Sequence, residues 1–256
     1  MRKSALFAGL FALVLGMVFA VAAQAADDIQ AGEELSKKLD YKGAAAVYEK
    51  MLAGDAKNYD ALWRAADNYI KMGIMAKEAD KAALYEKAAG FAGKAVEISP
   101  DKIEGHVKLA IAKGRLALFK GGKIKVELSK DVKIEAEKAL QIDPKNDEAL
   151  HTLGSWHREV ATLPGVLKMF AKMLYGGLPP ASKDEAVKYL EEATAVNPKV
   201  VEHHLELGKC YMTVGKWDMA RKAWNDCLAL KPVEAYDKAF QDEARSLISE
   251  YKSKKG

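Results

Sequence analysis

Four histidines in the C-terminal half carry the side chains best suited to chemistry, as ligands of a metal ion. His151 and His157 are six residues apart on one predicted helix, and adjacent His203 and His204 lie on another. A metal site needs imidazoles that converge, and neither spacing places two rings on the same helix face. We therefore expect core or partly exposed histidines, with no metal site and no cofactor.

Catalytic motifs are also missing from the sequence. It contains no G-x-S-x-G turn, no G-x-x-x-x-G-K phosphate loop and no H-E-x-x-H zinc motif. Most carboxylates are spaced four residues from a lysine, as on solvated helix faces. The net charge of +4 is too weak and too dispersed to predict nucleic-acid binding. The sequence thus predicts a protein that is not an enzyme.

One helix–turn–helix unit, residues 201–235, positions the second histidine pair. Small Gly208 and Ala220 would let its two helices approach closely, Gly215 lies at the turn, and Pro232 ends the second helix. This pattern resembles the tetratricopeptide repeat, a unit of about 34 residues. One such unit cannot bury its apolar face alone, so the resemblance implies neighbouring repeats.

The same pattern recurs along the chain, with prolines ending similar segments at Pro100, Pro144 and Pro198. A helical bundle with chance prolines would not place small residues and prolines in step. We predict an all-α, right-handed solenoid of about five tetratricopeptide-like helix pairs over residues 26–256. Repeats start near residues 25, 59, 103, 147 and 201, and a C-terminal capping helix spans 235–251.

Two repeats contain irregular stretches. In the third, residues 119–123 interrupt the helical pattern, and Ile124 and Val126 alternate with charged residues. Because no partner strand is evident, we expect a loop or extended hinge there. In the fourth, residues 163–176 form an inserted helix, and Ser182 and Glu185 make a capping box where the next helix begins.

The inserted helix carries an apolar stripe at helical spacing: Val166, Leu167, Phe170, Met173 and Leu174. This stripe could fill space between repeats, close over an acyl chain as a lid, or dock onto a membrane or a partner helix. We favour a cover over the groove rather than a docking surface.

The repeat resemblance implies that the first helices line a concave groove. Their inward positions include six candidate partner-binding residues: Trp63, Asp67, His151, Ser155, Arg158 and Lys209. This mixture of aromatic and polar groups suits a peptide or another mixed ligand. Acidic residues near the start of these helices, such as Glu148 and Glu202, are also explained as favourable charges in a first turn.

The fourth and fifth repeats carry a more specific resemblance. The chain is similar there to the regulator of microtubule dynamics family in the following residues: His151, Leu153-Gly154, Trp156, Glu159-Val160-Ala161, Leu178-Pro179-Pro180 and Leu207-Gly208-Lys209-Cys210-Tyr211. The family resemblance implies a tetratricopeptide fold. Some animal relatives are associated with phospholipids, so it also implies lipid as an alternative ligand.

The N-terminus has the pattern of a secretory signal peptide over residues 1–25. A basic start at Arg2-Lys3 precedes an apolar run and the small-residue site Ala23-Gln24-Ala25. We expect cleavage near Ala25 and a periplasmic or secreted protein, with an uncleaved membrane anchor as the alternative. In such a compartment Cys210 and Cys227 could be oxidised, but their register displaces them along the helix pair, so we expect two separate thiols, with Cys227 buried.

These observations lead to two expected functions. The first is a non-catalytic periplasmic scaffold for protein–protein interaction, with a protein or peptide partner in the concave groove. The second is a carrier of a lipid or another apolar small molecule, with the inserted helix as its lid. The sequence sets neither the partner nor the oligomeric state.

Overall fold

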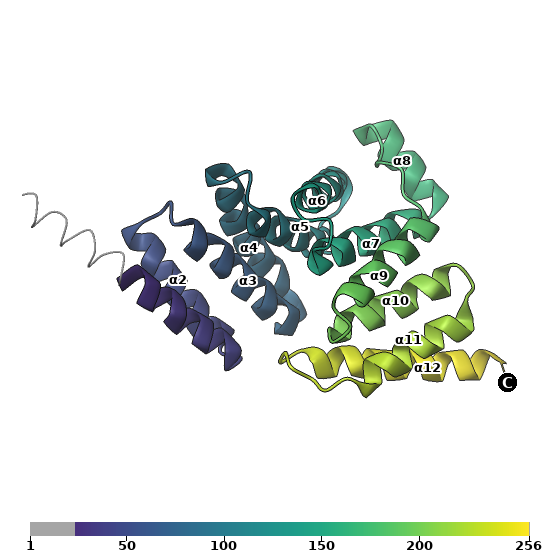
Figure 1. The fold of residues 1–256 in the computed structure, drawn as a ribbon. Helices are drawn as coiled ribbons and strands as arrows, with labels where there is room; N and C mark the ends of the chain where they lie inside the picture. The colour runs from purple at the N-terminus through teal and green to yellow at the C-terminus, as the bar shows by residue number, and fades with distance from the viewer. Residues whose placement is uncertain (1–23, 256) are drawn as a thin grey trace, which may run out of the picture.

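The computed structural model describes residues 24–255. The predicted signal segment therefore lies almost wholly outside the described residues. Within them the chain consists of helices joined by turns and loops, without strands, and forms a curved array of helix pairs (Figure 1). This arrangement confirms the predicted all-α solenoid. Among the described residues, no helix has the length and hydropathy needed to cross a membrane.

Pairs of successive helices make up the array. The first pair is residues 24–37 with α2 (Tyr41–Gly54), and the others follow in chain order. They are α3 (Tyr59–Met75) with α4 (Glu78–Ile98), α5 (Ile103–Ala117) with α6 (Gly122–Ile142), α7 (Asp147–Thr162) with α9 (Lys183–Val196), and α10 (Val201–Thr213) with α11 (Trp217–Ala229). Between α7 and α9 lies the additional helix α8 (Gly165–Tyr175), and α12 (Asp237–Lys255) follows the last pair.

Local sequence explains where these helices start. Asn58 and Asn146 accept hydrogen bonds from the backbone three residues later, so they cap α3 and α7. Ser182 caps α9 in the same way, through hydrogen bonds from Asp184 N and Glu185 N. A capping box would also have Ser182 N donate to the side chain of Glu185. In the structure Ser182 N donates to His157 Nδ1 instead.

Small residues set the close contact within each pair. A Cβ added to Gly208 of α10 would lie 2.2 Å from Nε1 of Trp224 on α11, and one added to Gly154 of α7 would lie 1.9 Å from Leu190 of α9. These distances are far below van der Waals contact, so the larger partner fills the space that glycine leaves. The core consequently follows the array as a series of clusters between neighbouring helices.

The predicted loop or hinge around Ile124 and Val126 is wrong. Both residues belong to α6, which begins at Gly122 with a positive φ of 54°. Because they alternate with charged residues, the sequence suggested a break in the helix there. In the structure Val126 is buried and Ile124 faces solvent. Val126 instead belongs to a helical set of buried residues with Val132, Ala136 and Ala139.

The two cysteines are free and Cys227 is buried, as predicted, and Cys210 is buried as well. Burial raises the pKa of Cys210 to about 12 and that of Cys227 to about 11. Thiols with such pKa values are protonated at neutral pH and poorly nucleophilic. They pack as small core residues.

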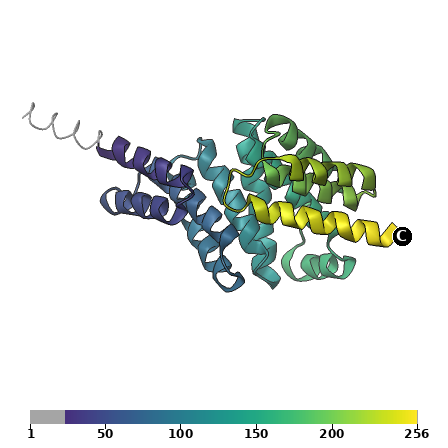
Figure 2. The same cartoon turned by 90° about the horizontal axis from the view of Figure 1, so that it is seen from below.

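Helix α12 packs against α10 and α11 and lies beside them (Figure 2). The segment before it, residues 231–236, extends across to the N-terminal repeats, and we call it the strap. Tyr41 of α2 donates to Glu234 Oε2 at 2.5 Å, and Lys71 of α3 donates to Glu234 Oε1 at 3.2 Å. Ala235 N also donates to the Tyr41 hydroxyl at 3.3 Å. The strap thus joins the two ends of the array.

Candidate binding cavity on the concave face

Charged side chains from successive first helices form a row on the concave face, which we call the ion-pair row. Lys108 of α5 donates to both carboxylate oxygens of Glu148 on α7 at 2.8 Å, and its ammonium lies 2.8 Å from Asp67 of α3. Arg115 of α5 pairs with Glu202 of α10 at 2.5 Å. Each pair bridges different repeats, so the row helps to fix the curvature of the array.

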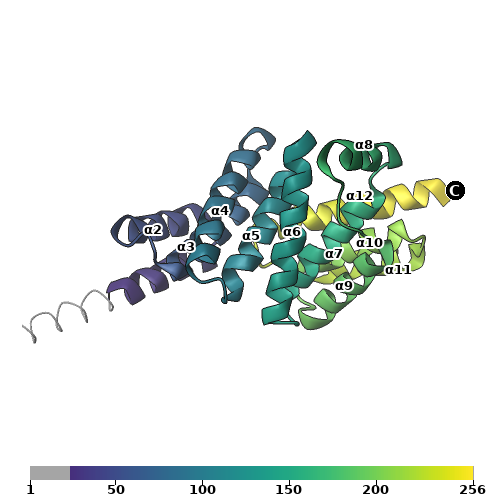
Figure 3. The ribbon, with the colours of Figure 1, turned by 90° about the horizontal axis from the view of Figure 1, so that it is seen from above.

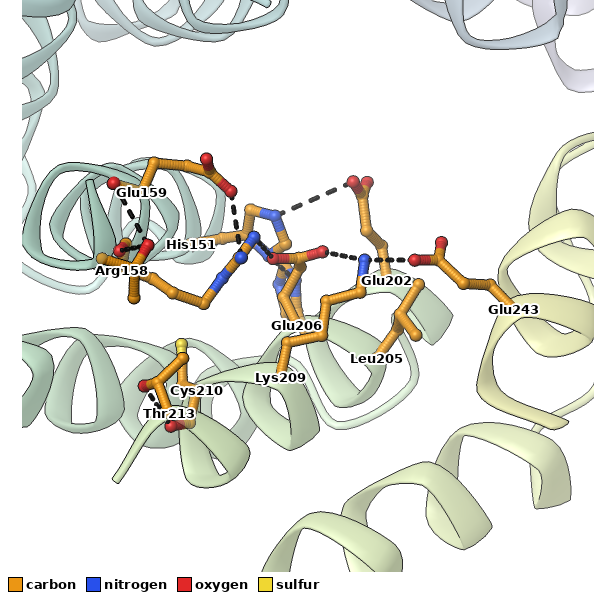
Figure 4. Close-up of polar contacts among 12 residues, drawn as sticks. His151, Arg158, Glu159, Glu202, Leu205, Glu206, Lys209, Cys210, Thr213 and Glu243 are labelled. Atoms are coloured by element: carbon orange, nitrogen blue, oxygen red, sulfur yellow. Dashed lines mark hydrogen bonds and ion pairs between the residues drawn. The ribbon is translucent and has the colours of Figure 1, made fainter. Parts of the chain in front are cut away.

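Glu206 of α10 lies at the centre of the second part of the row (Figure 4). Its carboxylate accepts hydrogen bonds from Arg158 of α7 and from Lys209 of α10, each at 2.7 Å. Lys209 also lies 2.7 Å from Glu243 of α12. The row therefore continues from the repeats onto the final helix.

Burial opposes ionisation along this row, but the partners outweigh it. Asp67 and Glu148 raise the pKa of Lys108 above its ordinary value in spite of desolvation. Arg158 and Lys209 likewise hold the pKa of Glu206 well below its usual range. Breaking a buried pair by removing one partner typically costs about 3–5 kcal/mol. The row is therefore part of the framework of the concave face.

Two histidines face each other beside the row. Nδ1 of His151 on α7 lies 2.9 Å from Nδ1 of His203 on α10, and Nε2 of His203 lies 3.1 Å from the Asp147 carboxylate. If His203 donates to Asp147, its Nδ1 must accept from His151, which leaves Nε2 of His151 as an acceptor. Burial lowers the pKa of His151 to about 4, so this imidazole is neutral at physiological pH.

A cavity of about 940 Å³ lies against the row and the histidines. This volume falls within the range of small-molecule and peptide-anchor sites, roughly 300–1,000 Å³. One part of its wall is polar: Asp67, Lys71, Lys108, Arg115, Glu148, His151, Ser155, Arg158, Glu202 and Glu206. The other part is mainly apolar: Val126, Val132, Trp156, Val160, Leu163, Leu167, Phe170 and Leu178.

Trp156 is a nearly buried residue of the apolar part whose polar atom is satisfied. Its Nε1 donates to the Ser129 carbonyl at 2.7 Å and to the Ser129 hydroxyl at 3.0 Å, so the indole ring can face the cavity with its polar atom satisfied. Strap residues Val233, Glu234 and Tyr236 also line the cavity, and Glu234 pairs with Lys71 of its polar part. The cavity is thus bounded by repeats two to five, α8 and the strap.

Two polar atoms on cavity-lining residues lack a hydrogen-bond partner within the described chain. They are the Ser155 hydroxyl and Nε of Arg158, both buried and one helical turn apart on α7. Buried polar groups are almost always hydrogen-bonded, and each exception requires an explanation. A ligand that accepts from Arg158 Nε and bonds to Ser155 would satisfy both.

The cavity includes four of the six predicted groove residues: Asp67, His151, Ser155 and Arg158. Lys209 instead lies between Glu206 and Glu243, where α12 covers it. Trp63 packs with Tyr59 and Leu62 at the N-terminal end of the array, and the Arg64 guanidinium lies 4.1 Å over its ring. The structure therefore does not bring Trp63 to the cavity.

Of the five predicted lid residues, Leu167 and Phe170 line the cavity, whereas Val166, Met173 and Leu174 are exposed and do not line it. His157 and His204 are buried, and His204 bonds to the Pro198 carbonyl at 2.8 Å. Nowhere in the described part of the chain do three His, Cys, Asp or Glu side chains gather to hold a metal ion.

Sequence reasoning missed Lys108, Arg115 and Glu206. Each of them follows an inward-facing position of its helix by one residue. They lie on the same helical stripe as the acidic residues near the helix starts. Opposite charges recur along that stripe in neighbouring repeats, for example Lys108 in repeat three and Glu148 in repeat four. This alternation between repeats was the available signal.

The fold is that of a tetratricopeptide solenoid, with a cavity on its concave face. A thermophilic tetratricopeptide-repeat protein of Thermus thermophilus has a similar fold, with a TM-score of 0.61, 16% identity, and coverage of 85% of this chain and 97% of that one. The model of the family "Regulator of microtubule dynamics protein 1-3" matches residues 23–252. The chain belongs to this family.

Curated relatives agree with the family match. The mouse regulator of microtubule dynamics protein 1 is 25% identical over 85% of this chain and 74% of its own length. The bovine protein of the same name is 26% identical over 92% of this chain and 77% of its own. The similarity therefore extends over most of the solenoid, beyond the C-terminal half that carried the resemblance in the sequence.

Proposed function

We propose that this protein is a non-catalytic, exported binding scaffold that holds a segment of a protein partner in the concave cavity. The observation that carries the proposal is the pair of buried, unsatisfied polar atoms, Ser155 Oγ and Arg158 Nε, on two residues that line the cavity. A peptide carbonyl can accept from Arg158 Nε, and a peptide amide can donate to Ser155. An apolar side chain of the partner would fill the space beside Trp156 and Phe170.

The polar atoms nearby support a peptide more than a fully apolar ligand. His151 offers a neutral acceptor, because burial keeps its imidazole unprotonated. The carboxylates and cations of the ion-pair row are already neutralised by one another, so a strongly charged ligand would have to break a buried pair. A near-neutral segment with one apolar anchor fits this wall best.

A second function is favoured by the apolar part of the cavity. Leu167, Phe170 and Ala171 of α8 line this part together with Val160 and Leu178, and neither lysine of α8 is among the lining residues. An acyl chain or another apolar molecule would bury its surface there, with its polar end towards Ser155. We keep a carrier of an apolar small molecule as the alternative.

One experiment separates the two functions. A photo-crosslinking amino acid is placed at Ser155, and a matched control replaces Ser246, an exposed serine of α12. After irradiation in cells, native mass spectrometry of the gently isolated protein reports any adduct. Its mass also reports whether cleavage has occurred after Ala25, which the predicted signal peptide requires.

A polypeptide adduct at Ser155 that is absent at Ser246 is the outcome expected of the scaffold. An adduct of lipid mass, lost when Phe170 is replaced by Asp, would establish the carrier instead. Equal polypeptide adducts at both positions would refute specific binding in the cavity. Retention of residues 1–25 would refute the exported, processed form.

A further inference from the structure

Helix α8 is apolar on two faces. Its inner residues Leu167, Phe170 and Ala171 line the cavity, while Val166, Met169 and Met173 follow an i, i+3, i+7 line on the outer side. Six large apolar side chains of this helix are each between 44% and 67% exposed: Val166, Leu167, Met169, Phe170, Met173 and Leu174. An exposed apolar patch of this density marks an interaction surface.

The corner between α5 and α6 extends this patch. Leu118 and Ile124 are also exposed there. The corner lies beside the end of α8, since Lys130 of α6 donates to the Tyr175 carbonyl at 3.1 Å, and a Cβ on Gly122 would lie 3.4 Å from the Tyr175 hydroxyl (Figure 3). We call residues 118–125 and 165–175 together the rim patch. Both segments contribute to the wall of the cavity.

The charges of the rim patch all have one sign. Neither segment contains an Asp or Glu, whereas together they contain five lysines: Lys120, Lys123, Lys125, Lys168 and Lys172. Lys120 and Lys123 pair with Glu86 and Glu127, but Lys125 and Lys172 make no ion pair with any residue that the structure describes. The patch therefore combines exposed apolar side chains with a basic frame.

This combination selects a particular kind of partner. A helix that lies in a membrane interface places apolar side chains among the acyl chains, while lysines at its sides reach the anionic headgroups. We propose that the rim patch docks on the surface of an anionic lipid bilayer, with α8 lying in the plane of the interface. The proposal goes beyond the scaffold function, because it uses neither the ion-pair row nor Ser155.

Docking in this orientation has a consequence for the cavity. The inner face of α8 and the α5–α6 corner both belong to its apolar part, so that part would lie next to the membrane. The strap, which pairs with Lys71 of the polar part, would face away. A partner segment could then enter the cavity while the protein remains on the bilayer.

The test is vesicle sedimentation with the chain from residue 26 onward, which retains every described core cluster and omits the apolar run at residues 5–22. Vesicles contain either phosphatidylcholine alone or phosphatidylcholine with phosphatidylglycerol. The protein should partition onto the anionic vesicles and bind the neutral ones far more weakly. Replacing Met169 and Met173 by Ser should weaken anionic binding by about tenfold or more.

The basic frame is tested by Lys125→Gln with Lys172→Gln, which should weaken binding by roughly fivefold per lysine on anionic vesicles only. Matched controls outside the patch are Met75→Ser with Met219→Ser and Lys188→Gln with Lys216→Gln, all at exposed positions. These controls should bind as the parent chain does. All the substitutions are on the surface, so circular dichroism should show an unchanged fold.

Hydrogen exchange distinguishes other occupants of the patch. On anionic vesicles, amides of residues 165–175 should become protected while those of α11 do not change. Protection of α8 without vesicles, growing with protein concentration, would mean that a second copy covers the patch and would overturn the proposal. Equal binding to both vesicle types, or equal losses in patch and control variants, would also overturn it.

Discussion

At the scale of single residues, His151 gives the protein a defined response to acid. Its pKa of about 4 lies below the ordinary 6.5 because its imidazole is buried beside His203. A group with a lowered pKa in the folded state contributes stability that is present above pH 6.5 and lost as the pH falls towards 4. Between pH 7 and pH 5 this loss amounts to about 2 kcal/mol.

The free energy of unfolding of the parent chain should fall between pH 7 and pH 5. We predict that this fall is about 2 kcal/mol smaller in the variant His151→Gln. Urea unfolding at the two pH values measures it. His157 also has a lowered pKa, but it contributes equally to the parent and the variant. Glu202 and Glu206 have lowered pKa values as well, so their contributions are lost only at lower pH. An unchanged pH dependence would show that His151 is not buried as a neutral group.

At the scale of helices, the close contact of α10 and α11 depends on the absence of a side chain at Gly208. Gly208→Leu would place atoms where the Trp224 ring lies, 2.2 Å from the position of a Cβ. Overpacking of this kind typically costs about 1–3 kcal/mol or more. We therefore predict a lower midpoint of thermal denaturation.

Gly90 of α4 provides the matched control, because a Cβ added there meets no atom within 4 Å. Gly90→Leu should be neutral or stabilise the helix by about 0.5–1 kcal/mol, since leucine is the better helix former. If the two variants had the same midpoint, the proposed packing of α10 on α11 would be wrong.

The helices were largely predictable because their signals are local. Residues such as Gly208 and Pro232 mark a close contact and a helix end by their own geometry. The start of α6 was misread because the alternation of Ile124 and Val126 has the period of a strand, whereas in the structure Val126 is one of the buried residues of the helix. Short segments of this kind are decided by tertiary contacts.

The cavity was predictable only in part, for a different reason. Inward positions such as Ser155 and Arg158 follow from the repeat pattern. Which repeats enclose the cavity depends on the twist between successive pairs and on segments outside the repeats. Trp63 lies too far towards the N-terminus, and Lys209 is covered by α12 through Glu243. Neither effect is encoded in one repeat.

At the scale of the whole molecule, Glu234 joins the first two repeats to the C-terminal segment. We predict that Glu234→Gln weakens this link by about 1 kcal/mol or more, because a neutral amide replaces the charged acceptor of Tyr41 and Lys71. Hydrogen exchange should show faster opening of α2. Glu192→Gln, at an exposed position of α9, is the control and should leave α2 unchanged. If the amides of α2 exchanged equally fast in the two variants, Glu234 would not be the residue that links α2 to the C-terminal segment.

The strap also bears on the order in which the chain folds. In a repeat array, contacts join neighbours in sequence, so structure can spread from any repeat and the ends can fray independently. The hydrogen bonds between Tyr41 and the strap instead join residues 193 and 194 positions apart. Loop closure over such a length is entropically costly until the intervening repeats are ordered. The strap contact should therefore form last, and once formed it makes the unfolding of the two ends cooperative.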